Sequence, residues 1–216
     1  MKEKMTYAVL GLGRYGQAVA RELSNGGEDV IAVDCDEDVV NAFSTEVPLC
    51  KCADITDSEV LEQLGIADVD VVIIAMASNF EASVMATVLC KEIGVKKVIV
   101  KCASDMACRI LSKVGADQVV FPEKESGSRL AKNLMSPDLL DIIDLSRDIS
   151  MVEMEVRPEW VGKNLVKLNL RRKYSINIVA IVQDNAVTIN IDPEKPLEEK
   201  MRLIVIGETE KLSRLK

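Results

Sequence analysis

The sequence feature that most constrains the fold is the stretch from residue 7 to residue 16, Tyr-Ala-Val-Leu-Gly-Leu-Gly-Arg-Tyr-Gly. Its apolar start, Tyr7–Leu10, predicts a short buried strand, and the pattern from residue 17 onward predicts a helix. Between them, Gly11, Gly13 and Gly16 have the spacing of a turn that admits a pyrophosphate and lets the helix pack close to the strand. An ordinary glycine-rich turn is the alternative, but the setting of strand, turn and helix favours a dinucleotide-binding loop.

A second expected strand, Val30–Val33, ends in Asp34, about twenty residues after the loop, where a ribose-binding acid is expected. Helix capping is the alternative role for this carboxylate. Arg14 lies inside the loop, which is unusual for a plain dehydrogenase. It would bind phosphates beyond a pyrophosphate, from its own nucleotide or a neighbouring subunit's, unless it is a surface arginine. Tyr15 is included in the same binding loop.

Strand and helix patterns alternate from Thr6 to Phe121, which predicts six βα units. Such units form an α/β fold with a Rossmann-like, doubly wound parallel sheet of strand order 3-2-1-4-5-6. The expected strands are Tyr7–Leu10, Val30–Val33, Leu49–Cys52, Val69–Ala75, Lys97–Lys101 and Gln118–Phe121.

The pattern changes after Pro122, and a second, smaller α+β domain is expected. Residues 123–145 have a helical pattern with a break at Ser136-Pro137, because proline interrupts a helix. The chain is therefore divided into domains 1–133 and 134–216, and the smaller one is expected to gain stability by dimerising. Its expected elements are strands at Ser150–Val156, Ile176–Gln183, Val187–Ile191 and Arg202–Ile206, a hairpin turn at Asp184-Asn185 and a final helix at Glu208–Leu215.

Composition argues against several classes of function. The 216 residues include 27 basic and 35 acidic ones, a formal charge of -8 that disfavours non-specific binding to nucleic acid. Histidine, the commonest acid–base catalyst near neutral pH, does not occur. No apolar run reaches the length of a membrane-spanning helix and no signal peptide precedes the first strand, so a cytoplasmic protein is expected.

The six cysteines are expected to be free thiols in a reducing compartment, since none has CxxC spacing. A zinc site would need four thiolates. Such a site is not expected, because the third strand, with Cys50 and Cys52, lies far from the fifth, next to Cys102, in this sheet.

The carboxyl ends of the other strands supply further candidates, since a ligand lies across these ends. Asp54 is placed to accept from an adenine amino group or to be a solvated loop acid, and Ala75 leaves room for a base or sugar. Lys101 offers charge to bound phosphates, unless it is solvated. Glu123 would face a bound anion, so we expect a cation such as Mg²⁺ between them; the alternative is an acid that favours a helix N-terminus.

Several segments carry a resemblance to a known family. They are the loop at 7–16, Ala-Val-Asp (32–34), Val-Ile-Ile-Ala-Met-Ala (72–77), Val-Lys (100–101), Gly-Ala-Asp-Gln-Val-Val-Phe-Pro-Glu-Lys (115–124), Ile-Asp-Leu-Ser (143–146) and Leu-Ile-Val-Ile-Gly (203–207). With these segments the chain resembles, over essentially its whole length, the KtrA/TrkA-type cytosolic regulatory subunits of bacterial potassium transporters, which carry RCK (also called KTN) domains.

The resemblance implies N-terminal domains that bind ATP, ADP or NAD(H), form dimers and assemble into an octameric ring beneath a membrane potassium-transporter subunit. It implies that Arg14 contacts a terminal phosphate across the dimer, that Asp34 holds the ribose and that Glu123 lies at a cation. The C-terminal domains of such proteins can bind cyclic di-AMP. The matching residues here are Asn169–Lys173, Ile176 and Pro193. A basic patch that solvates a dimer edge is the alternative for them.

The leading hypothesis is a nucleotide-sensing gating subunit, not an enzyme, held at the inner face of the membrane by its partner. An NAD-dependent oxidoreductase is the alternative, opposed by the missing histidine, Arg14 and the small second domain. A redox-sensing repressor is a third hypothesis, opposed by the acidic charge and the lack of a helix-turn-helix segment.

Overall fold

The structure is a computed structural model that describes residues 4–135, 139–146, 148–184 and 186–212. The chain folds into two compact units, Met1–Glu123 and Lys124–Lys216. The boundary predicted between residues 133 and 134 falls further along, inside helix α6 (Pro122–Met135). In the described ranges, no helix combines the length and the apolar character needed to cross a membrane.

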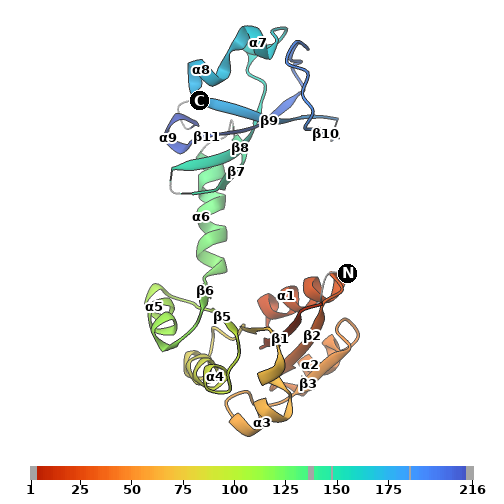
Figure 1. Cartoon of the computed structure of the whole chain (residues 1–216), viewed down its shortest axis with the longest axis vertical. Coiled ribbons are helices and arrows are strands. Elements are labelled where there is room, and N and C mark those ends of the chain that lie inside the picture. Colours follow the sequence, from red (N-terminus) through yellow and green to blue (C-terminus); the bar gives the residue numbers. More distant parts are fainter. Residues whose placement is uncertain (1–3, 136–138, 147, 185, 213–216) are drawn as a thin grey trace. The chain divides into compact units, whose positions relative to one another are not determined.

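The first unit is a six-stranded parallel sheet whose consecutive strands are connected by helices (Figure 1). Its order, β3-β2-β1-β4-β5-β6, confirms the doubly wound order predicted from the sequence. The strands are β1 (Thr6–Leu10), β2 (Asp29–Asp34), β3 (Leu49–Cys52), β4 (Val71–Ile74), β5 (Lys97–Lys101) and β6 (Gln118–Val120). The helices are α1 (Arg14–Asn25), α2 (Glu37–Phe43), α3 (Ser58–Gln63), the 3-10 turn η1 (Ile66–Asp68), α4 (Phe80–Glu92) and α5 (Asp105–Val114).

Both faces of this sheet are buried, because neighbouring residues of a strand point to opposite faces. Leu10 of β1 belongs to a core cluster that includes residues of α3, α4 and α5, whereas Val9 belongs to a second cluster with residues of α1 and α2. All four residues of β4 are buried. This double cover explains why the sequence of β4 is a continuous apolar run and does not alternate.

Side-chain caps fix the helices that follow β2 to β5. Asp36, Asp57, Asn79 and Ser104 each accept a hydrogen bond from a backbone N–H in the first turn of α2, α3, α4 and α5, respectively. Such caps satisfy N–H groups that have no partner inside the helix. Helix α1 differs, because its N-cap is Gly13, which has no side chain to accept those bonds.

The second unit contains a five-stranded antiparallel sheet of order β10-β9-β11-β8-β7. Buried and half-buried residues alternate along most of β8 and β11. The buried residues Val152, Met154, Leu203 and Val205 pack with Trp160 in a separate core. The strands are β7 (Leu139–Asp144), β8 (Ile149–Glu155), β9 (Ile176–Gln183), β10 (Ala186–Thr188) and β11 (Arg202–Glu208). The helices are the 3-10 turn η2 (Pro158–Trp160), α7 (Leu165–Leu168), α8 (Leu170–Tyr174) and α9 (Thr209–Leu212).

Two predictions for this part of the chain were wrong. Strand β7 replaces the last part of a helix expected to reach Leu145, because its backbone pairs antiparallel with β8. The strand expected at Val187–Ile191 ends earlier, within β10. The break at Ser136-Pro137, the second residue of the Asp184-Asn185 turn and the end of the final helix beyond Leu212 lie outside the described residues.

One pair of cysteines is oxidised. Cys102, directly after β5, forms a disulfide with Cys108 in α5, and their Cα atoms are 5.3 Å apart. The prediction of free thiols is therefore wrong for these two residues, because the chain reverses at the start of α5 and brings them within disulfide reach. The free thiols are Cys35, Cys50, Cys52 and Cys90.

Candidate nucleotide-binding site

The glycine loop lies between the end of β1 and the start of α1. Gly11 has a φ of +98°, a conformation that residues with a side chain rarely adopt. A Cβ atom at Gly16 would lie 1.9 Å from the carbonyl oxygen of Gly11, so only glycine lets α1 pack this closely on the loop. A Cβ atom at Gly13 would meet no protein atom within 4 Å, so the space beside this residue is open to a ligand.

Helix α1 begins at this loop and favours an anion there. It has 12 residues, no side-chain cap at its start and no acidic residue in its first turn. The N–H groups at the start of such a helix, together with the positive end of its dipole, attract a phosphate. The open space beside Gly13 and the start of α1 therefore form one feature suited to phosphate.

Asp34, at the end of β2, is held by two backbone groups. Its Oδ2 accepts the N–H of Leu12 at 2.6 Å, and its Oδ1 accepts the N–H of Asp36 at 3.0 Å. The cap of α2 is Asp36, whose Oδ1 accepts from Asp38 and Val39, so the helix-capping alternative for Asp34 does not apply. Each carboxylate oxygen has a second lone pair, which leaves Asp34 able to accept from ribose hydroxyls.

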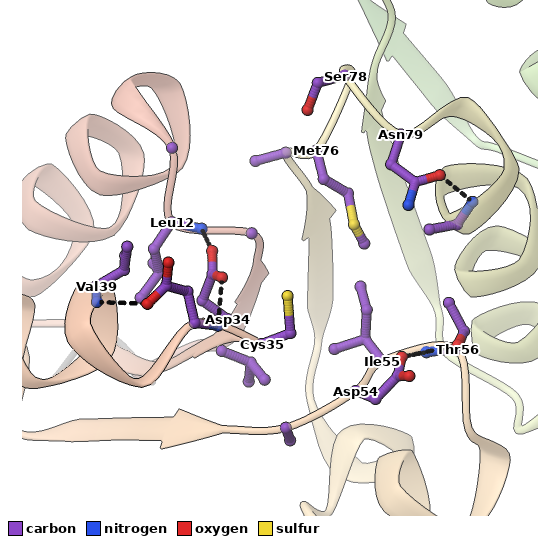
Figure 2. A pocket seen from close by; sticks show the side chains of 17 residues that line it. Leu12, Asp34, Cys35, Val39, Asp54, Ile55, Thr56, Met76, Ser78 and Asn79 are labelled. Atoms are coloured by element: carbon purple, nitrogen blue, oxygen red, sulfur yellow. Dashed lines mark hydrogen bonds between the residues drawn. The ribbon is translucent and has the colours of Figure 1, made fainter.

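A cavity of about 580 Å³ opens at the carboxyl ends of β1 to β4, where a doubly wound sheet holds its ligand. This volume lies in the usual range for pockets that bind small molecules. Figure 2 shows side chains from the ends of β2, β3 and β4 gathered around the opening, including Asp34, Ile55 and Met76. The predicted site residues that line it are Gly11, Gly13, Asp34, Asp54 and Ala75.

Asp54 follows β3 and holds the turn that begins α3. Its Oδ1 accepts the backbone N–H of Thr56 at 2.9 Å and the hydroxyl of the same residue at 2.7 Å. These bonds, the hydroxyl bond first, lower the pKa of the Asp54 carboxyl below its ordinary value. The carboxylate is therefore charged near neutral pH and lies in the wall of the cavity, where an amino group of a base can reach it.

Three other predicted residues form a second cluster, outside the wall of the cavity. The ammonium Nζ of Lys101 lies 2.6 Å from Oε1 of Glu123 and 5.5 Å from the centre of the Tyr15 ring. The Lys101 side chain is 15% exposed and that of Glu123 is 62% exposed. The hydrogen bond from Lys101 is the main reason why the pKa of Glu123 is lowered. This cluster joins the start of α1 to the end of β5 and the start of α6.

The other two predicted residues, Arg14 and Gly16, also lie outside the cavity wall. Arg14 is the first residue of α1 and is exposed, whereas Gly16 is buried against the loop. The structure thus brings five of the predicted residues to one cavity. Arg14 is not in the cavity wall, but it directly follows the wall residue Gly13 and lies on the first turn of α1.

The residues around Glu123 do not fit a cation site built by this chain alone. Its carboxylate accepts a hydrogen bond from the Lys101 ammonium, so this ammonium already supplies the positive charge that a metal ion would bring. In the described part of the chain, no group of three or more carboxylates, cysteines or histidines is arranged to hold a metal ion. The role of Glu123 as a metal ligand stays a prediction.

Met76 follows Ala75 at the end of β4, where the sequence predicts room for a base or sugar, and it lines the cavity. Sequence reasoning missed other residues of the wall, among them Cys35, Thr56 and Asn79. Asn79 also caps α4 by accepting the N–H of Ala82 at 3.1 Å. Each of these residues lies in the segment that follows its strand, and whether such a side chain reaches the cavity depends on how that segment folds.

A smaller cavity of about 260 Å³ lies in the second unit. Asn169, Arg171 and Ile176, which the resemblance implied for cyclic di-AMP, line it. Pro193 does not line it, but its carbonyl accepts the N–H of Val166, a wall residue, at 3.3 Å. The last two residues of the expected basic run are not part of the wall.

Two family models match the chain. The TrkA-N domain matches residues 7–122 and the TrkA-C domain matches residues 151–216. The Ktr system potassium uptake protein C of Bacillus subtilis (strain 168) is 38% identical over 211 residues, which cover 98% of this chain and 96% of that protein. The Ktr system potassium uptake protein A of the same organism is 34% identical over 208 residues, which cover 96% of this chain and 94% of that protein.

The fold also occurs in solved structures of the GsuK channel. One aligns with a TM-score of 0.70 at 17% identity over 99% of this chain, which spans only 39% of the channel chain. Another, of the GsuK channel bound to NAD, aligns with a TM-score of 0.55 at 23% identity over 98% of this chain and 38% of the other. With two matched domains and relatives similar along nearly its whole length, the chain belongs to the TrkA family of potassium uptake proteins.

Proposed function

We propose that the chain is a nucleotide-sensing regulatory subunit that gates potassium uptake through a membrane transporter subunit. The observation that carries the proposal is the cavity at the ends of β1 to β4, with the glycine loop in its wall and the Asp34 carboxylate beside it. The relatives at 38% and 34% identity, both named potassium uptake proteins, support the transport system. We also propose that the chain is not an enzyme, since it has no histidine for acid–base catalysis.

The contacts support one orientation of a bound nucleotide. Phosphates would lie beside Gly13 and the start of α1, where the space is open and the helix dipole is positive. The ribose would bond to Asp34, and the base would lie between Asp54 and the apolar surface of Met76. ATP, ADP and NAD(H) are the candidate ligands, because all of them contain the pyrophosphate that such a loop admits.

Arg14 supplies the sensing step in this proposal. It is the exposed first residue of α1 and lies outside the cavity wall, which supports a contact with a phosphate beyond the pyrophosphate, on its own nucleotide or on that of a neighbouring copy. ATP and ADP differ by one phosphate, so discrimination between them must come from a group that touches that phosphate. Allosteric coupling energies are typically about 1–3 kcal/mol per site, and a ring of identical sites repeats the contact.

The assembly that we propose consists of dimers joined in a ring, an octamer, on the cytoplasmic side of the membrane beneath a potassium-transporter subunit. Within a dimer, the neighbouring copy whose nucleotide Arg14 could contact would be the other subunit. In the second unit, the cavity lined by Asn169, Arg171 and Ile176 would take cyclic di-AMP, whose phosphates an arginine can bond.

The proposal is tested with the full chain by calorimetric titration with ATP, ADP and NADH and by light scattering with each nucleotide. Dissociation constants in the micromolar range for ATP and ADP are expected, with a ring whose dimensions depend on the nucleotide. Asp34→Asn should weaken binding, whereas Asp57→Asn, which changes the cap of α3 outside the cavity, should not. Binding of NADH alone, or an assembly indifferent to ATP and ADP, would exclude the proposed switch.

A further inference from the structure

The disulfide between Cys102 and Cys108 lies next to the cluster of Tyr15, Lys101 and Glu123. Cys102 is the residue directly after Lys101, and its N–H donates to the carbonyl of Val120 at 2.9 Å, which continues the pairing of β5 with β6. Lys101 in turn reaches the Tyr15 ring on α1 and the carboxylate of Glu123. The disulfide is thus covalently attached to the backbone that positions the Lys101 ammonium.

The other half of the disulfide is fixed by the start of α5. The side chain of Ser104 accepts the N–H of Ala107 at 3.1 Å, and its carbonyl accepts the N–H of Cys108 at 2.9 Å. The bond therefore ties the end of β5 to the capped first turn of α5. Without it, the end of β5 and the start of α5 are joined by the intervening loop, by these hydrogen bonds and by the packing of α5 on the core of the sheet.

The two sulfurs differ in access. Cys102 is buried, but it lines another cavity of the first unit, of about 230 Å³, together with Lys101 and Met106. Cys108 is half-buried. Among the other thiols, Cys90 is buried, and burial raises its pKa to about 12, so it stays protonated and unreactive at neutral pH.

We propose that Cys102 and Cys108 form a reversible thiol–disulfide modification site, and that oxidation strengthens nucleotide binding by fixing Lys101 beside the glycine loop. The oxidant is a small disulfide, RSSR. The Cys108 thiolate attacks it, forms Cys108–S–S–R and releases one RS⁻; the Cys102 thiolate then attacks the Cys108 sulfur and releases the second RS⁻. Two electrons pass from the cysteines to RSSR, and the two thiol protons end on the two RSH molecules.

The effect on affinity rests on the proposed nucleotide function. A loop that is already held in its bound conformation loses less entropy when the ligand binds. Closing the disulfide restricts the backbone next to Lys101, so the ammonium needs less ordering on binding. The oxidised protein should therefore bind ADP about threefold to tenfold more tightly than the reduced protein.

The test equilibrates the full chain in buffers of reduced and oxidised glutathione, followed by alkylation, mass spectrometry and calorimetric titration with ADP. Under oxidising conditions the mass should fall by two hydrogen atoms, with Cys102 and Cys108 protected from alkylation and ADP bound more tightly. Cys108→Ser should abolish this response, and Cys52→Ser, a matched control at an exposed thiol, should retain it.

Two results would overturn the proposal. One is that both cysteines remain alkylatable in the most oxidising buffer, and the other is that oxidised and reduced protein bind ADP equally. If neither form binds ADP, the nucleotide function and its coupling to oxidation both fail. The mass titration then decides alone whether the reversible disulfide exists.

Discussion

The carboxylate of Asp34 accepts the backbone N–H of Leu12 at 2.6 Å, which ties the end of β2 to the glycine loop after β1. The same side chain accepts the N–H of Asp36 through its other oxygen. Two neighbouring strand ends are therefore joined by one charged group. A ribose bound to Asp34 and a phosphate bound at the loop would be held by one rigid frame.

Asp34→Asn should weaken ADP binding by about tenfold or more, because hydrogen bonds to a charged group are worth about 1.5–3 kcal/mol. The amide keeps the shape of the side chain but has only one oxygen to accept the two backbone N–H groups. Calorimetric titration with ADP measures the change, with thermal melting as the control for folding. Unchanged affinity in a folded variant would remove Asp34 from the ribose site.

Substitutions at two glycines of the loop should have different effects, one on the stability of the fold and the other on nucleotide binding. Gly16→Ala places a methyl group against the carbonyl of Gly11 and should destabilise the fold by about 1–3 kcal/mol, because the backbone must shift. Gly13→Ala adds its methyl group in open space and should leave the melting temperature nearly unchanged while weakening nucleotide binding. Thermal melting and ADP titration of both variants provide the comparison. Equal loss of stability in the two variants would contradict this assignment.

Arg14→Ala should remove the discrimination between ATP and ADP more than it weakens ADP binding. The reason is that the arginine would contact the phosphate that only ATP carries. The ratio of the two dissociation constants, measured by calorimetry, is the quantity to compare with the unaltered chain. Arg14→Lys keeps the charge but loses the bidentate geometry, so it should recover only part of the ratio. An equal loss of affinity for ATP and for ADP would contradict the role assigned to Arg14.

Asp70 should make stability depend on pH at the opposite, amino-terminal edge of the sheet. Its carboxylate accepts hydrogen bonds from the N–H and the hydroxyl of Thr6 and forms an ion pair with Lys96. These contacts lower the pKa of Asp70 from 3.8 to about 2, and the bond from the Thr6 N–H is the largest cause. A lowered pKa means that the stabilisation is complete above pH 3.8 and is lost as the pH falls through 2.

The comparison with Asp70→Asn isolates this effect. The difference in melting temperature between the unaltered chain and the variant should be constant from pH 7 down to about pH 4 and shrink between pH 4 and pH 2. Melting curves followed by circular dichroism at several pH values measure it. A difference that is independent of pH across this range would show that the carboxylate charge does not contribute.

Much of the first unit could be predicted because its signals are local. Glycines end the strands or helices, and apolar runs such as Val71–Ile74 mark strands that are covered on both faces. Strand β7 could not be recognised in this way. Its residues allow a helical pattern, and only pairing with β8, which follows a separate turn, makes them a strand.

In the candidate site too, the features with a local sequence signal could be predicted and those that depend on tertiary contacts could not. Gly13, Asp34 and Asp54 follow from the rule that ligands lie at the ends of parallel strands. The bond of Lys101 to Glu123 and the disulfide of Cys102 depend on tertiary distances that spacing in the sequence does not give.

The absence of a side chain at Gly16 has a mechanical consequence. Because the backbone of α1 touches the carbonyl of Gly11 with no room for a methyl group, the loop and the start of the helix are in direct backbone contact. A force on a phosphate held by the loop would act on all 12 residues of α1 as on a rigid rod. A displacement of the loop would therefore be passed along the helix as far as its last residue, Asn25.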